Sequence, residues 1–217
     1  MPIYAKLSIT PTLYTYDQKM NTEKRKRTID PEDKARRIFS SARELFVKKG
    51  YYRVSIPDIV SNSGVSTGAI YNLFGSKENL AKVLHKKTLG DFNEMFLHRL
   101  HDRKTTHDKL RAFAEVVYEL TEKDPAMMEY LLFMKHAEFM EDAAPICFSE
   151  PFQVIRQIIA DGMEKGEVKT GDVFLIAVSF TGAILRPAQL RIQCVLTEHL
   201  PDLIDQLMTN AWDAIKA

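Results

Sequence analysis

Apolar residues recur along this chain at intervals of three and four positions, the spacing that places side chains on one face of a helix. The first such segment starts after Asp30, a helix-capping residue followed by proline, and ends at Gly50. Its apolar stripe consists of Ile38, Ala42, Leu45 and Phe46. The pattern predicts one helix that packs on a single side.

Two short helices joined by a tight turn are predicted next. Ser55 caps the first, which runs to about Asn62. A glycine-containing turn over residues 63–66 then forces the second helix across the first at a steep angle. Ile70 and Phe74 face inward in this second helix, toward the stripe of the preceding long helix. Its outer face is small and polar, with one phenol: Thr67, Gly68, Ala69, Tyr71 and Asn72.

The remaining chain has the same helical periodicity and no strand pattern or internal repeat, so we expect an all-α protein. Its helices are predicted at about 76–102, 106–122, 125–140, 146–165, 172–194 and 201–216. Pro151 and Pro187 fall inside two of these helices, and each should kink, shorten or split its helix.

The net charge of +1 conceals a strong asymmetry. Residues 1–90 hold 17 Lys and Arg against 8 Asp and Glu, whereas residues 91–217 hold 13 against 21. The N-terminal part therefore carries +9 and the remainder −8. A basic segment joined to an acidic one is typical of a nucleic-acid-binding domain attached to a domain of another kind.

Composition is that of an ordinary soluble chain, with 217 residues and 45% apolar content, enough to bury a core. The longest unbroken apolar run, 173–178, is too short to span a bilayer, and the N-terminus lacks a signal-peptide pattern. We therefore expect a cytoplasmic protein without a membrane partner. The two cysteines, Cys147 and Cys194, offer neither a disulfide framework nor CxxC metal spacing.

Residues 1–28 contain turn formers and no sustained helical period, so we expect a flexible arm. Its segment Lys24-Arg25-Lys26-Arg27 is basic enough to bind phosphates or to enter a minor groove. A solvated tail is the alternative for an isolated charge run. Met20 is an alternative start position, since every recognisable feature follows it.

A dense set of residues then identifies a family resemblance. These are Gly50-Tyr51, Ser55-Ile56, Ile59, Gly64-Val65-Ser66, Gly68, Ile70-Tyr71, Phe74, Ser76-Lys77-Glu78 and Leu80. Over about residues 29–80 the chain resembles the DNA-binding signature of the TetR family of bacterial transcriptional repressors. Leu73 departs from that pattern, because many relatives carry an aromatic residue or His there and leucine cannot hydrogen-bond a phosphate.

The resemblance implies a helix-turn-helix DNA-binding domain over residues 29–75 and a helical effector-binding and dimerisation domain over 76–217. Base edges would be contacted by Thr67, Gly68, Ala69 and Asn72, with Ala69 on a thymine methyl and Asn72 on adenine. Phosphates would be held by Lys26, Arg27, Tyr52, Ser55, Ser66, Tyr71 and Lys77. Of the two adjacent tyrosines, Tyr51 is expected to be the packed one.

In this family the later helices usually enclose an apolar effector pocket, and large adaptable side chains suit such a cavity. Candidates for its lining are Phe113, Tyr118, Met127, Tyr130, Phe133, Met134, Phe152 and Phe174. At helical spacing such residues are more often plain core, and the sequence leaves both interpretations open.

The last helices have apolar faces broad enough to pack both inward and outward, and the family implies a four-helix dimer bundle there. Candidate interface residues are Phe180, Ile184, Ile204, Leu207, Met208 and Trp212. The alternative is that these side chains close the core of a monomer.

Enzyme chemistry is poorly supported, because HExxH, GxxxxGK[ST] and GxSxG are all missing. His98, His101, Asp102 and His107 invite a metal interpretation, but exposed helix-end residues explain them as well, and we expect no cofactor or metal. The sequence thus favours a ligand-responsive repressor that binds a palindromic operator as a homodimer and is released by a small apolar effector. A helical enzyme on a TetR-like fold and a protein-binding helix-turn-helix remain the alternatives.

Overall fold

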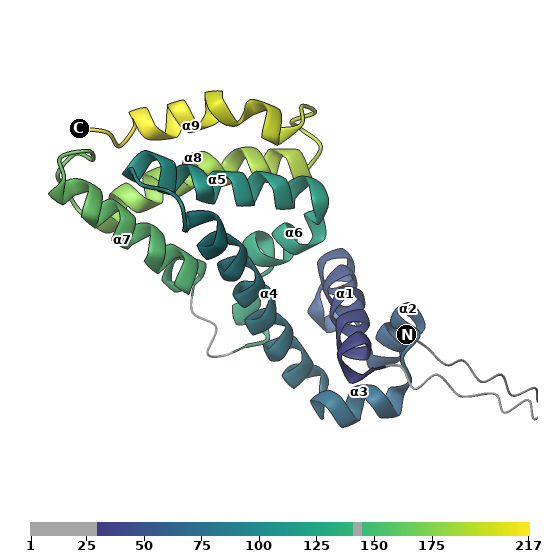
Figure 1. Ribbon diagram of the computed structural model, residues 1–217. Coiled ribbons are helices and arrows are strands. Elements are labelled where there is room, and N and C mark those ends of the chain that lie inside the picture. The colour runs from purple at the N-terminus through teal and green to yellow at the C-terminus, as the bar shows by residue number, and fades with distance from the viewer. Residues whose placement is uncertain (1–29, 141–144) are drawn as a thin grey trace, which may run out of the picture.

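The computed structural model describes residues 30–140 and 145–217, which Figure 1 shows as packed helices. In chain order these are α1 (Pro31–Lys49), α2 (Ile56–Ser63), α3 (Thr67–Phe74), α4 (Lys77–Leu100), α5 (Thr106–Lys123), α6 (Pro125–Phe133), α7 (Glu150–Glu164), α8 (Val173–Ile192) and α9 (Ile204–Asp213). Short 3-10 turns lie between them: η1 (Tyr51–Arg53), η2 (His136–Glu138), η3 (Ile146–Phe148) and η4 (Leu200–Leu203). Within the described ranges an isolated bridge between Val168 and Lys216 is the only β pairing, so the predicted all-α fold is confirmed. The basic arm predicted over residues 1–28, with Lys26 and Arg27, lies outside these ranges.

The first helices begin where the sequence predicts, because their capping side chains accept hydrogen bonds from first-turn amides. The caps are Asp30, Ser55, Ser66 and Ser76. Each such cap contributes about 1 kcal/mol to helix stability. Ser55 also forms a reciprocal capping box with Asp58. Local side-chain chemistry therefore fixes the frame of this region.

The chain buries two apolar cores. The first joins α1, α2, α3 and the start of α4 through residues that include Ile38, Phe46, Ile59, Ile70 and Phe74. The predicted packing of the first stripe on the two short helices is thus confirmed. The second core joins α4, α5, α6, α7, α8 and α9. In Figure 1, α3 and α9 lie at opposite ends, and α4 runs from one core to the other.

Helix α6 follows α5 in the chain, yet it docks on the first core. Its Tyr130 is fully buried there. At its N-terminus, Asp124 caps α6 and accepts a hydrogen bond from Arg43 on α1, with 2.5 Å between Nη2 and Oδ2. Beyond its C-terminus, Phe139 stacks on Tyr51, with ring centroids 4.2 Å apart. The three-helix unit therefore contacts the N-terminus of α6 and the segment that follows this helix.

Four predicted helices differ from the observed ones. The one predicted over 201–216 is a 3-10 turn, η4, followed by α9, which ends at Asp213. The helix predicted over 125–140 ends at Phe133. The one predicted over 146–165 begins only at Glu150, because Pro151 lacks an N–H and is accommodated in the first turn. Pro187, by contrast, neither shortens nor splits α8, which continues to Ile192.

Helix α8 is, among the described helices, the one long and apolar enough to cross a membrane by length and composition. Core helices of soluble proteins meet the same criteria. Here α8 packs on α5, α7 and α9 and contributes Ile176, Phe180 and Ile184 to the second core. Its apolar character is therefore partly explained by packing within the chain.

Candidate DNA-binding and effector sites

The outer face of α3 is open to solvent. Exposed positions are Thr67, Gly68, Tyr71 and Asn72, with Ala69 half-buried between them. Ile70 and Phe74 are buried, as their spacing predicts. Leu73 is 40% exposed and adds one apolar side chain to the rim of this face. α3 thus presents small and amide side chains to any partner that approaches it.

The turn that precedes α3 is held rigidly. Gly64 has φ +65°, and a Cβ there would lie 2.8 Å from Nη2 of Arg37. That same Nη2 donates a hydrogen bond of 2.6 Å to the carbonyl of Ser63. Any side chain at Gly64 would therefore both strain the backbone and displace the arginine. A short exposed helix fixed by such a turn is the geometry that places a recognition helix in the major groove.

Gly68, in contrast, is not required by the fold. It lies inside α3, where a Cβ would meet no atom within 4 Å. Glycine inside a helix is about 1 kcal/mol less favourable than alanine, so Gly68 lowers the stability of α3. Glycine is expected where another molecule approaches the backbone closely.

The residues predicted to hold phosphates differ in their availability. Tyr52 is 69% exposed, whereas Tyr51 is buried, so the predicted choice of Tyr51 as the packed tyrosine is confirmed. Tyr71 is also exposed. Ser55 and Ser66 use their hydroxyl oxygens to cap α2 and α3, which places both at helix N-termini, where backbone amides suit anions.

Lys77 is engaged within the protein. Its Nζ donates to the carbonyl oxygens of Val54 and Tyr51, at 3.0 and 3.2 Å. It also lies 4.1 Å from the ring centroid of Tyr51, as in a cation–π contact. The ammonium therefore ties the start of α4 to η1, a role that the sequence did not predict.

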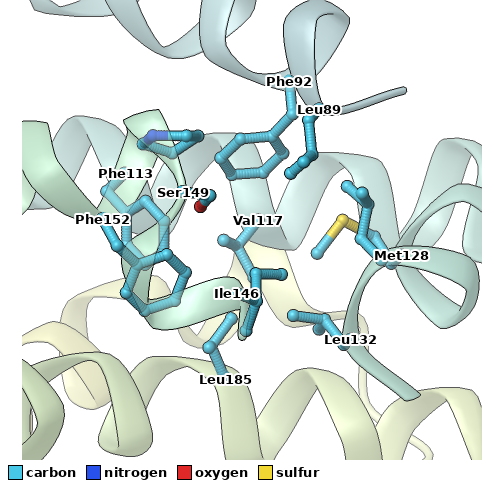
Figure 2. Close-up of a pocket in the computed structure, with 12 residues that line it drawn as sticks. Leu89, Phe92, Phe113, Val117, Met128, Leu132, Ile146, Ser149, Phe152 and Leu185 are labelled. Atoms are coloured by element: carbon cyan, nitrogen blue, oxygen red, sulfur yellow. The ribbon is translucent and has the colours of Figure 1, made fainter. Parts of the chain in front are cut away.

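An apolar cavity lies inside the second core, and Figure 2 shows its lining. The side chains come from α4, α5, α6, η3, α7 and α8: Leu89, Phe92, Phe113, Val117, Met128, Leu131, Leu132, Ile146, Ser149, Pro151, Phe152 and Leu185. Its free volume is about 20 Å³, room for roughly one water molecule. The lining side chains therefore fill almost all of the cavity in this conformation.

Of the eight residues predicted to line an effector pocket, Phe113 and Phe152 line this cavity. The other six lie elsewhere. Tyr118 is buried in the second core away from the lining, and Tyr130 is buried in the first. Met127, Phe133 and Met134 face grooves between α6 and the three-helix unit. Phe174 is exposed and stacks on Phe148.

Sequence reasoning missed most of the lining because it selected aromatic residues and methionines. Leucines such as Leu89, Leu132 and Leu185 have the same helical spacing whether they face a cavity or plain core. The serine before Glu-Pro has the pattern of an ordinary helix N-cap, which gives no sign that the Ser149 hydroxyl lines a cavity.

The predicted dimer residues need a correction. Phe180, Ile184 and Met208 are fully buried within the chain, so they close its own core and cannot reach a second copy. Ile204, Leu207 and Trp212 are partly buried against that core. The apolar side chains that α8 leaves exposed are Phe174, Leu175 and Val178. Sequence periodicity predicted apolar faces on both sides of α8, and the interface candidates Phe180 and Ile184 lie on its buried side.

Two histidines meet beside Tyr130, where α4 and η2 join the three-helix unit. The His85 and His136 ring centroids are 4.2 Å apart, and His136 lies 4.8 Å from the ring of Tyr130. Burial lowers the pKa of His85, and burial together with His85 lowers the pKa of His136 to about 4. Both imidazoles are therefore neutral at physiological pH. Across the described residues, no three His, Cys, Asp or Glu side chains gather as metal ligands.

A capped three-helix unit with an exposed third helix, joined to a larger helical domain, is the architecture of helix-turn-helix regulators. The family model for bacterial regulatory proteins of the tetR family matches residues 38–84. This match covers the DNA-binding unit, and the chain as a whole shares its fold with solved transcription regulators of the TetR family.

Relatives extend the similarity beyond the DNA-binding unit. The chain is 25% identical over 151 residues to the fatty acid metabolism regulator protein of Bacillus subtilis, covering 68% of this chain and 77% of that protein. It is 24% identical over 160 residues to the transcriptional activator FasR of Mycolicibacterium smegmatis, covering 70% and 72%. The crystal structure of FadR from Bacillus subtilis in complex with stearoyl-CoA superposes with a TM-score of 0.71 at 23% identity, covering 83% of this chain and 98% of that one. These relatives are transcription regulators.

Proposed function

We propose that this protein is a ligand-responsive transcriptional repressor that binds a palindromic operator as a homodimer and is released by a small apolar effector. The observation that carries the proposal is the position of α6, which lines the apolar cavity with one face and docks on the DNA-binding unit with the other. Residues 29–75 form the DNA-binding domain in this proposal, and residues 76–217 bind effector and dimerise. The proposed action on DNA places the protein in the cytoplasm.

On DNA, the exposed face of α3 enters the major groove. Thr67, Gly68, Ala69 and Asn72 face base edges, where Ala69 contacts a thymine methyl and Asn72 pairs with adenine. Tyr52 and Tyr71, with the caps Ser55 and Ser66, hold phosphates and fix the register. The basic segment that includes Lys26 and Arg27 adds further phosphate contacts. Lys77 contributes mainly by holding η1 in place.

The effector is an acyl compound such as a long-chain acyl-CoA. The cavity lining is aliphatic and aromatic, which suits a hydrocarbon chain. The relatives support the same class, since one is a fatty acid metabolism regulator and one solved structure holds stearoyl-CoA. The free volume of about 20 Å³ is far too small for such a chain, so binding requires the lining to move apart.

That movement reaches the DNA-binding domain through α6. Met128, Leu131 and Leu132 line the cavity, while Tyr130 on the same helix is buried in the first core. A ligand that pushes these three side chains outward therefore shifts or tilts α6. Because Asp124 ties the start of α6 to α1 and Phe139 ties the segment after α6 to Tyr51, the recognition helix moves with it. Half-sites spaced for the free dimer then no longer fit.

The second copy covers the exposed face of α8, where Phe174, Leu175 and Val178 lie. An apolar face of this kind on the surface of a soluble protein is typical of an interaction site. A two-fold dimer also doubles the few base contacts that one short helix can make, and it matches a palindromic operator.

Selection of bound DNA from a random pool tests the proposal. We expect an enriched two-fold symmetric sequence with half-sites about one helical turn apart. Palmitoyl-CoA should release the protein from that sequence, whereas CoA alone should not. Failure to enrich any sequence would contradict the DNA-binding function, and release by CoA alone would contradict the apolar effector.

A further inference from the structure

One lining residue of the cavity is polar. The other eleven lining side chains are aliphatic or aromatic or belong to methionine or proline, and Ser149 alone carries a hydroxyl. Figure 2 shows this hydroxyl directed among the apolar side chains that surround the cavity. Its Oγ is buried and has no hydrogen-bond partner in the described part of the chain.

The Ser149 hydroxyl does not make the capping hydrogen bond that its position would allow. Ser149 stands at the N-cap of α7, yet its side chain makes no capping hydrogen bond. Elsewhere Ser55, Ser66, Ser76 and Thr105 all cap their helices with the hydroxyl oxygen. The backbone of Ser149 is nevertheless firmly placed, because its N–H donates to Ile146 and its carbonyl accepts from Gln153.

An unpartnered buried hydroxyl is costly to a protein. Leaving such a group without a partner costs about 1 to 3 kcal/mol. Water does not offset this cost well, because the cavity holds about one water molecule and offers it no second polar side chain from the described residues. A partner that arrives with the ligand would remove the penalty only in the bound state.

The chemistry of that partner follows from the lining. No charged side chain lines the cavity among the described residues, so a buried carboxylate would lack a counter-ion and be strongly disfavoured. A serine O–H can donate one hydrogen bond to a neutral carbonyl oxygen. The hydrocarbon that follows such a carbonyl would lie against Phe92, Val117 and Leu132.

We propose that Ser149 Oγ donates a hydrogen bond to the carbonyl oxygen of the effector's acyl group, so that the site selects acyl thioesters over alkyl analogues of equal length. This inference rests on the proposed function, since it takes the cavity as the effector site. Ser149 is then a specificity-determining residue, and the apolar lining supplies most of the affinity.

A pair of ligands that differ in one carbonyl tests the assignment. Palmitoyl-CoA carries the thioester carbonyl, whereas S-hexadecyl-CoA is the thioether with the same chain length. Their affinities for the full-length protein are measured by calorimetry, with Ser149→Ala as the test variant and Ser61→Ala, on the exposed side of α2, as the matched control. We expect the wild type and Ser61→Ala to prefer the thioester by about 3- to 10-fold, the range of one neutral hydrogen bond. Ser149→Ala should lose that preference and bind the thioether unchanged.

The outcomes separate this inference from the proposed function. Tight binding of both ligands by the wild type without preference, or an equal loss for both in Ser149→Ala, overturns the role of Ser149 and leaves the acyl effector standing. Binding of neither ligand overturns both. Thermal unfolding without ligand adds a check, because removing an unpartnered hydroxyl should leave the midpoint the same or raise it. A lowered midpoint would show that the hydroxyl serves the fold instead.

Discussion

The imidazole rings of His85 and His136 lie in contact, with centroids 4.2 Å apart, where α4 meets η2. Nδ1 of His85 and Nε2 of His136 are buried without a hydrogen-bond partner in the described ranges. Tyr130 packs beside them, and Arg43 is the charged group that acts on this tyrosine. A proton on either ring would thus place a cation in a buried site, and a proton on His136 would also be disfavoured by His85.

Stability should fall as the pH drops from about 6.5 toward 4. The folded protein holds the pKa of His136 at about 4, below the ordinary value of 6.5. The unfolded chain therefore binds more protons in this window, and protonation favours unfolding. The loss of unfolding free energy from His136 should reach about 3 kcal/mol at most, measured by urea denaturation at several pH values.

His136→Phe is the test variant, because it keeps an aromatic ring and removes the titration. Its stability should vary less with pH between 6.5 and 4 than that of the wild type. His101→Asn, at an exposed position, serves as the control and should retain the wild-type slope. An unchanged slope in His136→Phe would show that other groups dominate the acid response.

Gly68→Ala should weaken DNA binding without destabilising the fold. The position has room for a Cβ, and alanine is the better helix former, so the free energy of unfolding should rise by up to about 1 kcal/mol. Operator affinity should fall, because the added methyl separates α3 from the groove. Thermal unfolding and fluorescence anisotropy with labelled operator measure the two effects. A variant that binds the operator as well as wild type would remove Gly68 from the interface.

Lys77→Met should lower the stability of the protein and leave the salt dependence of DNA binding unchanged. The ammonium bonds two carbonyls and covers the Tyr51 ring, so its loss should cost about 1 to 2 kcal/mol of unfolding free energy. A residue that neutralises a phosphate would also reduce the slope of log affinity against log salt by about 1. We expect the slope to stay unchanged, and a reduced slope would return Lys77 to the phosphate contacts.

Val178→Glu should break the dimer and leave the monomer folded. The side chain is 45% exposed, so a carboxylate there is tolerated in the single chain but not inside an apolar interface. Light scattering should report half the wild-type mass, with unchanged helix content by circular dichroism. Asn62→Glu, at an exposed position of α2, is the matched control outside the last helices. A wild-type protein that is already monomeric would rule out the proposed interface.

The sequence was most informative where local chemistry decides the structure. The caps Asp30, Ser55, Ser66 and Ser76 predicted the first helix starts, and the spacing of Ile70 and Phe74 predicted the outer face of α3. These features depend on neighbours within a few residues. Helix periodicity also predicted the all-α class.

The sequence was least informative where contacts between segments far apart in the chain determine the structure. Phe180 and Tyr130 have similar spacing and chemistry, yet one closes the second core and the other docks on the first. Lys77 was predicted to contact phosphate, because no residue near it in the sequence indicates that the carbonyl oxygens of Tyr51 and Val54 lie beside its ammonium. Of the predicted pocket residues, Phe113 and Phe152 line the cavity, and most of the lining was missed because it comes from six separate elements.

In the proposed function, the small free volume of the cavity also affects how sensitively the protein responds to its effector. Any effector must first push apart a lining that leaves about 20 Å³ free, and that free energy is subtracted from what its contacts provide. The concentration at which genes respond is then set partly by how tightly the protein packs without ligand. Replacing Leu132 with a smaller side chain should therefore lower the effector concentration needed for release, without changing any polar contact. Core packing would then set the effector concentration to which the cell responds.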